Sequence, residues 1–236
     1  MRFEERELKP YAEPLSASEL QGGSVYFLVI YAPRDIPIME TWVFLGRDLE
    51  PNDADMLYFQ DVRSYRKGLR YDVGGGEAGD AHGDFVAYAE NEINHIFEYE
   101  RALDGLIKCS LRQKKLDQME PLFFEGRELQ PYPEPVTAAE LNEGSVYFAL
   151  NYADDVMLIP VMETRVFVGR NLEPHDQGKV YFEDEPSFRN GICYGAIEKD
   201  EWTIFCVESE NALDHIFDFE HVLEELMRCS VRRRKA

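Results

Sequence analysis

Residues 90–100 read ENEINHIFEYE and residues 210–220 read ENALDHIFDFE, so the chain carries one sequence motif twice. When the alignment of the two copies is extended to residues 112 and 232, 11 of 23 aligned positions are identical. Most of the differences are chemically close, such as Tyr99 in the first copy and Phe219 in the second. The chain is therefore predicted to have arisen by tandem duplication of one unit.

The duplication divides the 236 residues into two units of similar length. The first repeat is predicted to span residues 1–115, the second repeat residues 122–236, and residues 116–121 form the predicted linker. Each repeat is long enough to bury a core of its own. The hydrophobic content of 44% indicates a folded globular protein rather than a disordered acidic chain.

Apolar residues recur at helical spacing within and after both copies of the motif. They are Ile93, Ile96, Phe97, Leu103 and Ile107 in the first repeat, and Leu213, Ile216, Phe217, Leu223 and Met227 in the second. This spacing predicts an amphipathic helix of roughly twenty residues over residues 90–112 and again over residues 210–232. A second, weaker apolar stripe lies on the other side of each predicted helix. Because helices with two apolar sides are usually sandwiched, we expect each helix to be covered by the other repeat as well as by its own sheet.

Upstream of each predicted helix, the two repeats share the same succession of strand and turn signals. Residues 24–31 and 145–152 are dense in β-branched and aromatic residues, which indicates a central strand in each repeat. Ser16 and Thr137 are each followed three residues later by Glu, the capping-box pattern that begins a helix. The predicted fold class is α+β, with two tandem copies of a mostly antiparallel sheet of about four to five strands. A short N-terminal helix and a long C-terminal helix are expected to pack on one face of each sheet, and a short edge strand is expected at the start of each repeat.

Aromatic side chains on the outer face of the predicted strands form a candidate interaction surface. The exchange of Trp42 in the first repeat for Arg165 in the second places this position on the outer face. The residues assigned to this surface are Tyr26, Trp42, Phe44, Tyr147 and Phe167. His95 and His215 occupy the same helical position in the two repeats and join the candidate surface as structural or interface residues. Neither histidine has a second His or Cys at metal-ligand spacing, so a metal site is not predicted there.

Glu100 and Glu220 point into the main apolar stripe of the predicted helices. A half-buried carboxylate is costly in free energy unless it is paired and hydrogen-bonded. The arginines that both repeats carry near strand ends are Arg66 and Arg189, and Arg47 and Arg170. We prefer the first two and predict structural ion pairs between Glu100 and Arg66 and between Glu220 and Arg189, which fix each helix against its sheet.

The chain has a formal net charge of −21 and a pI near 4.6. This charge disfavours binding to nucleic acid or to an anionic membrane, because contact with phosphate requires Lys and Arg, and it is compatible with a basic protein partner. No run of ~18 apolar residues is present and the N-terminal residues are charged, so neither a membrane span nor a secretory signal is predicted. A cytoplasmic location is expected.

Cysteine spacing and glycine content provide no sign of a metal or cofactor site. The cysteines are Cys109, Cys193, Cys206 and Cys229, with no C-x-x-C pair, so neither a disulfide framework nor a zinc site is expected. The glycine-rich segment at residues 74–83 lacks Gly-Lys-Ser/Thr, carries acids and has no counterpart in the second repeat. It is interpreted as a flexible connection rather than a phosphate loop. We predict no catalytic residue, no metal and no cofactor.

The sequence favours an acidic, noncatalytic protein-interaction module of the inhibitor, immunity or adaptor type. The basis is the negative charge, the predicted outer aromatic residues and the lack of a known catalytic motif. The alternative is a small-molecule binding domain or an enzyme whose site lies between the two repeats. An apolar cleft that holds His95 or His215 together with Glu100 or Glu220 would favour this alternative. A DNA mimic is a third hypothesis. The two repeats are expected to pack on each other, and a homo-oligomer stays an open alternative to a monomer.

Overall fold

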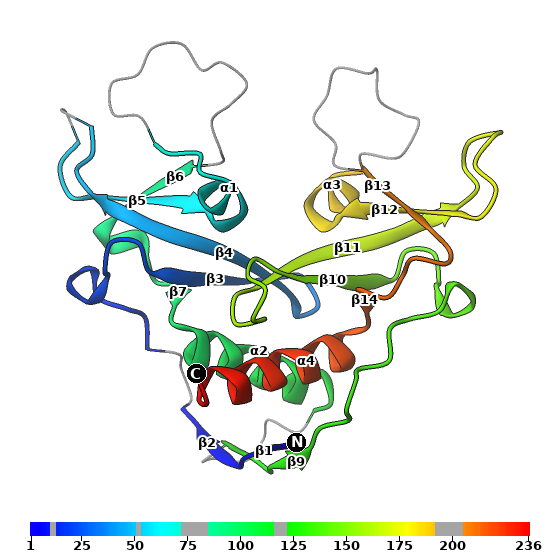
Figure 1. Cartoon of the computed structure of the whole chain (residues 1–236), viewed down its shortest axis with the longest axis horizontal. Helices are drawn as coiled ribbons and strands as arrows, with labels where there is room; N and C mark the ends of the chain where they lie inside the picture. Colours follow the sequence, from blue (N-terminus) through cyan, green and yellow to red (C-terminus); the bar gives the residue numbers. More distant parts are fainter. Residues whose placement is uncertain (10–12, 51–52, 72–84, 116–121, 192–204) are drawn as a thin grey trace.

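The structure is a computed structural model that describes residues 1–9, 13–50, 53–71, 85–115, 122–191 and 205–236. The predicted linker, the glycine-rich segment at residues 74–83 and Cys193 lie outside the described residues. The boundaries assigned to the two repeats therefore stay a prediction. Within the described part of the chain, the repeats have closely similar orders of helices and strands, and they face each other across an approximate two-fold axis (Figure 1).

Each repeat contributes one five-stranded antiparallel sheet. In spatial order, the first sheet consists of β6 (Phe85–Ala89), β5 (Met56–Asp61), β4 (Ile36–Arg47), β3 (Val25–Ala32) and β7 (Ile96–Phe97). The second sheet consists of β13 (Phe205–Ser209), β12 (Lys179–Asp184), β11 (Pro160–Arg170), β10 (Val146–Tyr152) and β14 (Ile216–Phe217). The short helices α1 (Val62–Arg66) and α3 (Glu185–Arg189) follow β5 and β12. The α+β fold class is confirmed, and the segments predicted as central strands form the inner strands β3 and β10.

The long helices are α2 (Tyr99–Gln113) and α4 (Phe219–Arg233), so the prediction that they begin at residues 90 and 210 is wrong. In the first repeat, a 3-10 turn, η2 (Glu90–Glu92), and the edge strand β7 precede the helix. The Val29 N–H donates a hydrogen bond to the His95 carbonyl at 2.9 Å, which ties this part of the motif to β3. Ile96 and Phe97 pack in hydrophobic cores on opposite faces of the sheet. Their spacing from later apolar residues also fits a helix, so periodicity alone did not separate strand from helix.

The main hydrophobic core contains residues from both repeats. It joins the inner faces of the two sheets to α2 and α4, and includes Phe27, Leu106, Phe148 and Leu226. The Tyr99 hydroxyl donates to the Leu226 carbonyl at 2.6 Å, from one long helix to the other. Figure 1 shows α2 and α4 lying side by side beneath the sheets. The expectation that each helix is covered by the other repeat as well as by its own sheet is confirmed.

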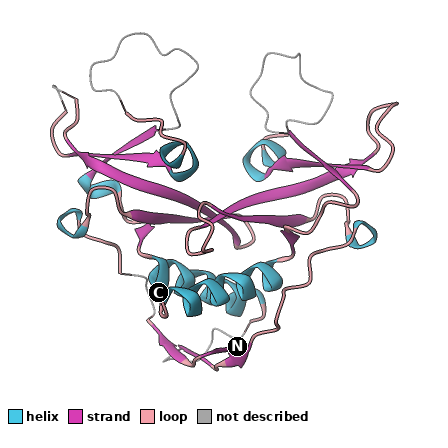
Figure 2. Cartoon of the chain, in the orientation of Figure 1, coloured by secondary structure: helices cyan, strands magenta, loops and turns pink. Residues whose placement is uncertain are grey.

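Short strands at the start of the repeats form two small sheets that join one repeat to the other. β1 (Arg2–Phe3) pairs with β9 (Arg127–Glu128), and β2 (Arg6–Leu8) pairs with β8 (Leu122–Phe124), both antiparallel. Figure 2 shows the helix pair between these small sheets and the two five-stranded sheets. The predicted edge strands therefore exist, but they pair with each other instead of extending the large sheets.

The outer faces of the two sheets are also buried, so the prediction of an exposed aromatic surface is wrong. Tyr26, Trp42, Phe44, Tyr147 and Phe167 are each at most 9% exposed. In the first repeat, Leu15 and Ile93 pack on this face, and Val136 and Leu213 do so in the second. The alternation along a strand identifies two faces but does not reveal what covers each of them.

The predicted N-terminal helices are single 3-10 turns, η1 (Ala17–Glu19) and η3 (Ala138–Glu140). The Ser16 N–H donates to Glu19 Oε2 at 2.7 Å, and the Thr137 N–H donates to Glu140 Oε2 at 2.8 Å. The side chain of the third residue therefore satisfies a backbone donor at the start of each turn, as the capping-box pattern predicts.

Candidate functional site

Glu100 is paired, as its position in the apolar stripe requires, but its partners are not the predicted one. Its carboxylate accepts hydrogen bonds from Arg6 Nη1 at 3.0 Å, Arg234 Nη2 at 3.2 Å and Ser230 Oγ at 2.6 Å. Burial by itself raises the pKa of Glu100, but the hydrogen bonds from Ser230 and Arg6 lower this pKa below its usual value. Arg66 lies exposed at the end of α1 and forms no ion pair with Glu100.

Glu220 mirrors Glu100 across the approximate two-fold axis. It accepts hydrogen bonds from Ser110 Oγ in α2 and from Lys114 Nζ just after the end of α2, both at 2.5 Å. Arg189 lies instead 4.0 Å from Glu185, within α3. The predicted pairing of Glu220 with Arg189 is wrong for the same reason as that of Glu100 with Arg66. Because α2 and α4 lie side by side, the start of each long helix meets the end of the other helix, not its own sheet.

The two histidines lie before short edge strands rather than on helices. His95 is exposed in the turn before β7. His215 is half-buried before β14, with Nε2 at 3.5 Å from Glu208 Oε1. Within the described part of the chain, no ion pair or hydrogen bond joins either histidine to Glu100 or Glu220.

A central cavity of about 620 Å³ lies between the two repeats, where β4 and β11 come together. Reciprocal hydrogen bonds cross this junction: Thr41 Oγ1 donates to the Pro160 carbonyl and Thr164 Oγ1 donates to the Pro37 carbonyl, each at 2.8 Å. The charged side chains in its wall are Glu40, Asp61, Arg63, Glu163, Arg165, Glu183 and Asp184. The central cavity is thus built from equivalent positions of both repeats.

Both arginines of the central cavity form ion pairs with Glu163. Arg63 of the first repeat and Arg165 of the second each form an ion pair with this carboxylate, and Arg165 also pairs with Glu208 at 3.2 Å. Burial by itself raises the pKa of Glu163, but the hydrogen bonds from Arg165 and Arg63 lower it below the usual value. Glu163 is therefore ionised at neutral pH, and neither arginine is free of a carboxylate partner.

Three other carboxylates in the wall have only neutral hydrogen-bond donors among the described residues. Glu40 accepts from Trp42 Nε1 at 3.0 Å. Asp61 accepts from the Ser64 N–H at 2.7 Å, and Asp184 accepts from the Ser187 N–H at 2.9 Å, so these two aspartates cap α1 and α3. The wall of the central cavity consequently carries an excess of negative charge.

A second cavity, the α4 cavity, has a volume of about 530 Å³ and lies within the second repeat. Its apolar wall includes Pro131, Pro133, Leu150, Met157 and Phe217. Its polar wall includes Tyr152 at the end of β10 and three charged residues of α4, which are Glu225, Arg228 and Arg232.

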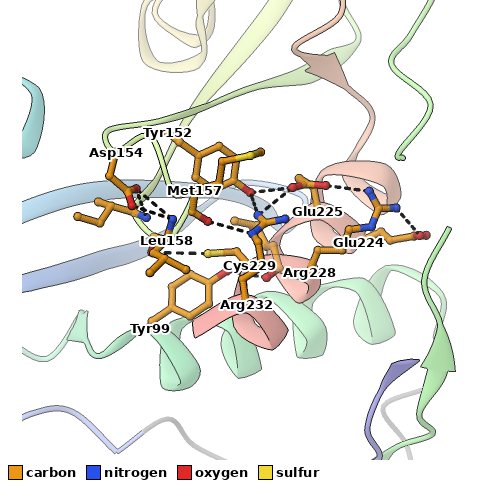
Figure 3. Close-up of polar contacts among 12 residues, drawn as sticks. Tyr99, Tyr152, Asp154, Met157, Leu158, Glu224, Glu225, Arg228, Cys229 and Arg232 are labelled. Carbon is orange, nitrogen blue, oxygen red and sulfur yellow. Dashed lines mark hydrogen bonds and ion pairs between the residues drawn. The ribbon is translucent and has the colours of Figure 1, made fainter. Parts of the chain in front are cut away.

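Glu225 is the centre of a hydrogen-bonded network in the α4 cavity (Figure 3). Its carboxylate accepts from the Tyr152 hydroxyl at 2.9 Å, from Arg232 Nη2 at 3.0 Å and from Arg228 Nη1 at 2.9 Å. Arg228 Nη2 also donates to Glu224 at 3.0 Å. Burial, followed by the nearby Glu225 charge, raises the pKa of Tyr152 far above its usual value. Tyr152 is therefore a neutral hydrogen-bond donor at physiological pH.

Neither a reactive thiol nor a cluster of metal ligands is found in the two cavities among the described residues. Burial raises the pKa of Cys206, in the wall of the central cavity, to about 11, so its thiol is protonated at neutral pH. No three His, Cys, Asp or Glu side chains within the described ranges are placed so that they could hold a metal ion.

Sequence reasoning did not identify the residues that line either cavity, although the sequence contains a signal for each set. Glu40 and Glu163 occupy equivalent positions in the two repeats, as do Asp61 and Asp184, so the acids of the central cavity recur with the duplication. For the α4 cavity the signal is a difference between the repeats: Glu225 of α4 aligns with Gly105 of α2.

Comparison of the chain with protein-family models, with curated proteins and with solved structures gives no match. Among the described helices, none is long and apolar enough to cross a membrane. The chemistry of the two cavities is therefore the guide to function.

Proposed function

We propose that the protein is a noncatalytic binding module whose central cavity accepts a basic segment of a protein partner. The observation that carries this proposal is the set of carboxylates Glu40, Asp61 and Asp184, which line the cavity without an ion-pair partner among the described residues. Lys and Arg side chains of a partner would supply the missing charges. The proposed interaction surface thus lies at the junction of the repeats and not on the outer strand faces, which are buried.

The overall charge of the protein supports the same kind of partner. A net charge of −21 steers a basic protein towards the molecule and repels nucleic acid and anionic membranes. Complementary charge of this kind mainly raises the association rate, and salt weakens its effect. We place this interaction in the cytoplasm, where the buried thiols of Cys109 and Cys229 would stay reduced.

The test is the binding of a fluorescent peptide of alternating Lys, Arg and Gly, measured by anisotropy over a range of salt concentrations. The variant E40Q/D61N/D184N removes three charges from the cavity, and Asn retains the ability to cap a helix. We expect its affinity to fall roughly tenfold, which corresponds to about 1.4 kcal/mol. A glutamate peptide of the same length should not bind.

The matched control is E7Q/E125Q/E143Q, which changes the net charge equally at exposed sites outside the cavity. An equal loss of affinity in both variants would mean that total charge, and not the central cavity, attracts the peptide. Failure of the basic peptide to bind at low salt would contradict the proposed function itself.

The geometry that would favour an enzyme or a small-molecule site between the repeats is not found among the described residues. Glu100 and Glu220 are held in ion pairs at the helix interface, and His95 is exposed. His215 lines the α4 cavity, which contains Glu225 and lies within one repeat.

A further inference from the structure

We propose that the α4 cavity is a separate binding site for a small organic carboxylate, whose apolar body packs on the proline-rich wall and whose carboxylate is hydrogen-bonded by Arg232. This inference concerns a different cavity and a different class of ligand from the proposed interaction with a basic protein.

The size and the apolar wall of the cavity suit a small molecule. Its volume of about 530 Å³ is in the range of ordinary ligand pockets. Pro131, Pro133 and Leu150 present rigid or branched apolar surfaces, and Tyr132, with 84% of its surface exposed, stands at the rim. A flat apolar body entering the cavity would remove apolar surface on both sides from water.

Within the network around Glu225, the hydrogen-bonding capacity that is left consists of donors. The Glu225 carboxylate already accepts three hydrogen bonds, so it has little capacity to bind a ligand donor. Arg232 uses Nε for the Met157 carbonyl at 3.1 Å and Nη2 for Tyr152 and Glu225, while no hydrogen bond of Nη1 is found within the described residues. Arg228 Nε is buried without a partner in the same part of the chain. A ligand that complements this network must therefore bring acceptor oxygens.

Accessibility identifies Arg232 as the residue that meets the ligand. The Arg232 side chain is 24% exposed, whereas those of Glu225 and Arg228 are 8% and 5% exposed. Asp214, the other acid of the wall, is 91% exposed and directed mostly to solvent. A carboxylate is the acceptor that a guanidinium binds most strongly, because the hydrogen bond is assisted by opposite charges.

The equivalent position of the first repeat has different chemistry. Gly105 replaces Glu225, Lys108 replaces Arg228, and Arg112 pairs with Asp35 in the turn after β3. The arrangement with two guanidinium groups around one buried carboxylate is thus a property of the second repeat.

The test uses benzoate and cyclohexanecarboxylate as probes, with binding measured by calorimetry and by ligand-observed NMR. Ligands of this size bind with a Kd on the order of 1 mM. Benzyl alcohol is the matched neutral probe, and we expect it to bind at least tenfold more weakly than benzoate, since a charged acceptor gains about 1.4 kcal/mol or more from a guanidinium. Equal binding of benzoate and benzyl alcohol, or no binding of either carboxylate, would overturn the proposal.

The variant N151W locates the site. Asn151 lies in the cavity wall on β10, and its counterpart in the first repeat is the partly exposed Ile30, so an apolar side chain is compatible with this strand position. We expect N151W to abolish benzoate binding by filling the cavity, while the matched variant I30W keeps the wild-type affinity. Unchanged binding in N151W would overturn the proposal. R232Q should also lose benzoate binding, and N151W keeps the test valid if R232Q does not fold.

Discussion

Both repeats contain a cluster of a tyrosine, an arginine and a carboxylate, but the carboxylate comes from a different position in each repeat. In the second repeat, Tyr152 and Arg232 meet Glu225, which lies on the helix itself. In the first repeat, Arg112 stacks against Tyr31 with 5.1 Å between the guanidinium carbon and the ring centroid, and pairs with Asp35 of the adjacent turn. The arginine and the tyrosine therefore occupy equivalent positions in the two repeats, while the position of the acid differs.

Steric space at one helix position explains this difference. A Cβ atom added at Gly105 would lie 3.0 Å from the Tyr31 hydroxyl, so a side chain where the second repeat has Glu225 would require this hydroxyl to move. The consequence is a difference in burial. The Asp35 side chain is 43% exposed, whereas that of Glu225 is 8% exposed. The two clusters should contribute very differently to stability, because solvent screens exposed ion pairs.

The largest predicted effect is the loss of Glu225. E225A leaves Arg228 and Arg232 without their shared carboxylate in a buried setting, and we expect the free energy of unfolding to fall by about 3–5 kcal/mol. The matched variant D35A in the first repeat should cost about 1 kcal/mol or less. Urea unfolding followed by circular dichroism measures both values. Similar losses in the two variants would show that the clusters are energetically equivalent despite their difference in burial.

The second prediction concerns the first residue of the short helices. Glu185 begins α3 and is 4% exposed, with Oε2 buried and unpaired among the described residues, whereas Val62 begins α1 and packs with Val43 and Val161. We expect E185V to stabilise the protein by about 1–3 kcal/mol, because it removes a poorly paired buried carboxylate. The reverse change V62E should destabilise it. Thermal unfolding measures both shifts, and a loss of stability in E185V would contradict this account.

The third prediction concerns pH and the pair Gln60 and Glu183. Gln60 Nε2 donates to Ser64 Oγ and to the Leu69 carbonyl, both at 3.2 Å, whereas both Glu183 oxygens are buried and unpaired in the described part of the chain. Burial, with a smaller contribution from Asp184, raises the pKa of Glu183. The folded state therefore holds this proton to a higher pH than the unfolded chain does, and stability falls as pH rises through the interval between the two pKa values.

E183Q removes this titration, so the stability of E183Q relative to the wild type should increase with pH. We expect E183Q to gain stability relative to the wild type between roughly pH 4.5 and roughly pH 8, measured by urea unfolding at both values. The exposed variant E143Q is the control and should show no such trend. A relative stability of E183Q that is constant with pH would contradict the assigned titration.

The smallest predicted effect concerns a pair of hydrogen bonds that is the same in both repeats. Thr41 and Thr164 donate equivalent hydrogen bonds of 2.8 Å across the junction. T41V and T164V should each cost about 1 kcal/mol, because each leaves a buried carbonyl without its donor. Chemical denaturation of the single variants and of the double variant measures this symmetry. Clearly unequal single effects would show that the junction is energetically asymmetric.

Local patterns in the sequence were sufficient to predict two similar units, the fold class, the inner strands and the need of Glu100 for a partner. These properties depend on residue spacing within one segment. A repeated motif indicates that two segments adopt similar backbone structures. An acid within an apolar stripe needs a hydrogen-bond or ion-pair partner in any fold. The start of the long helices was predicted wrongly because Ile96 and Phe97 satisfy both the strand and the helix period.

Tertiary structure alone decided which groups meet across the molecule. Glu100 pairs with Arg6 and Ser230 because α2 and α4 pack side by side, and Tyr26 and Trp42 are buried because segments distant along the chain cover the outer sheet faces. The two cavities arise in the same way, from the junction of β4 with β11 and from the packing of α4 against the proline-rich segment. The sequence by itself determined which side chains need burial or a charged partner, and long-range packing determined the partners, because local periodicity contains no information on the relative placement of separate elements.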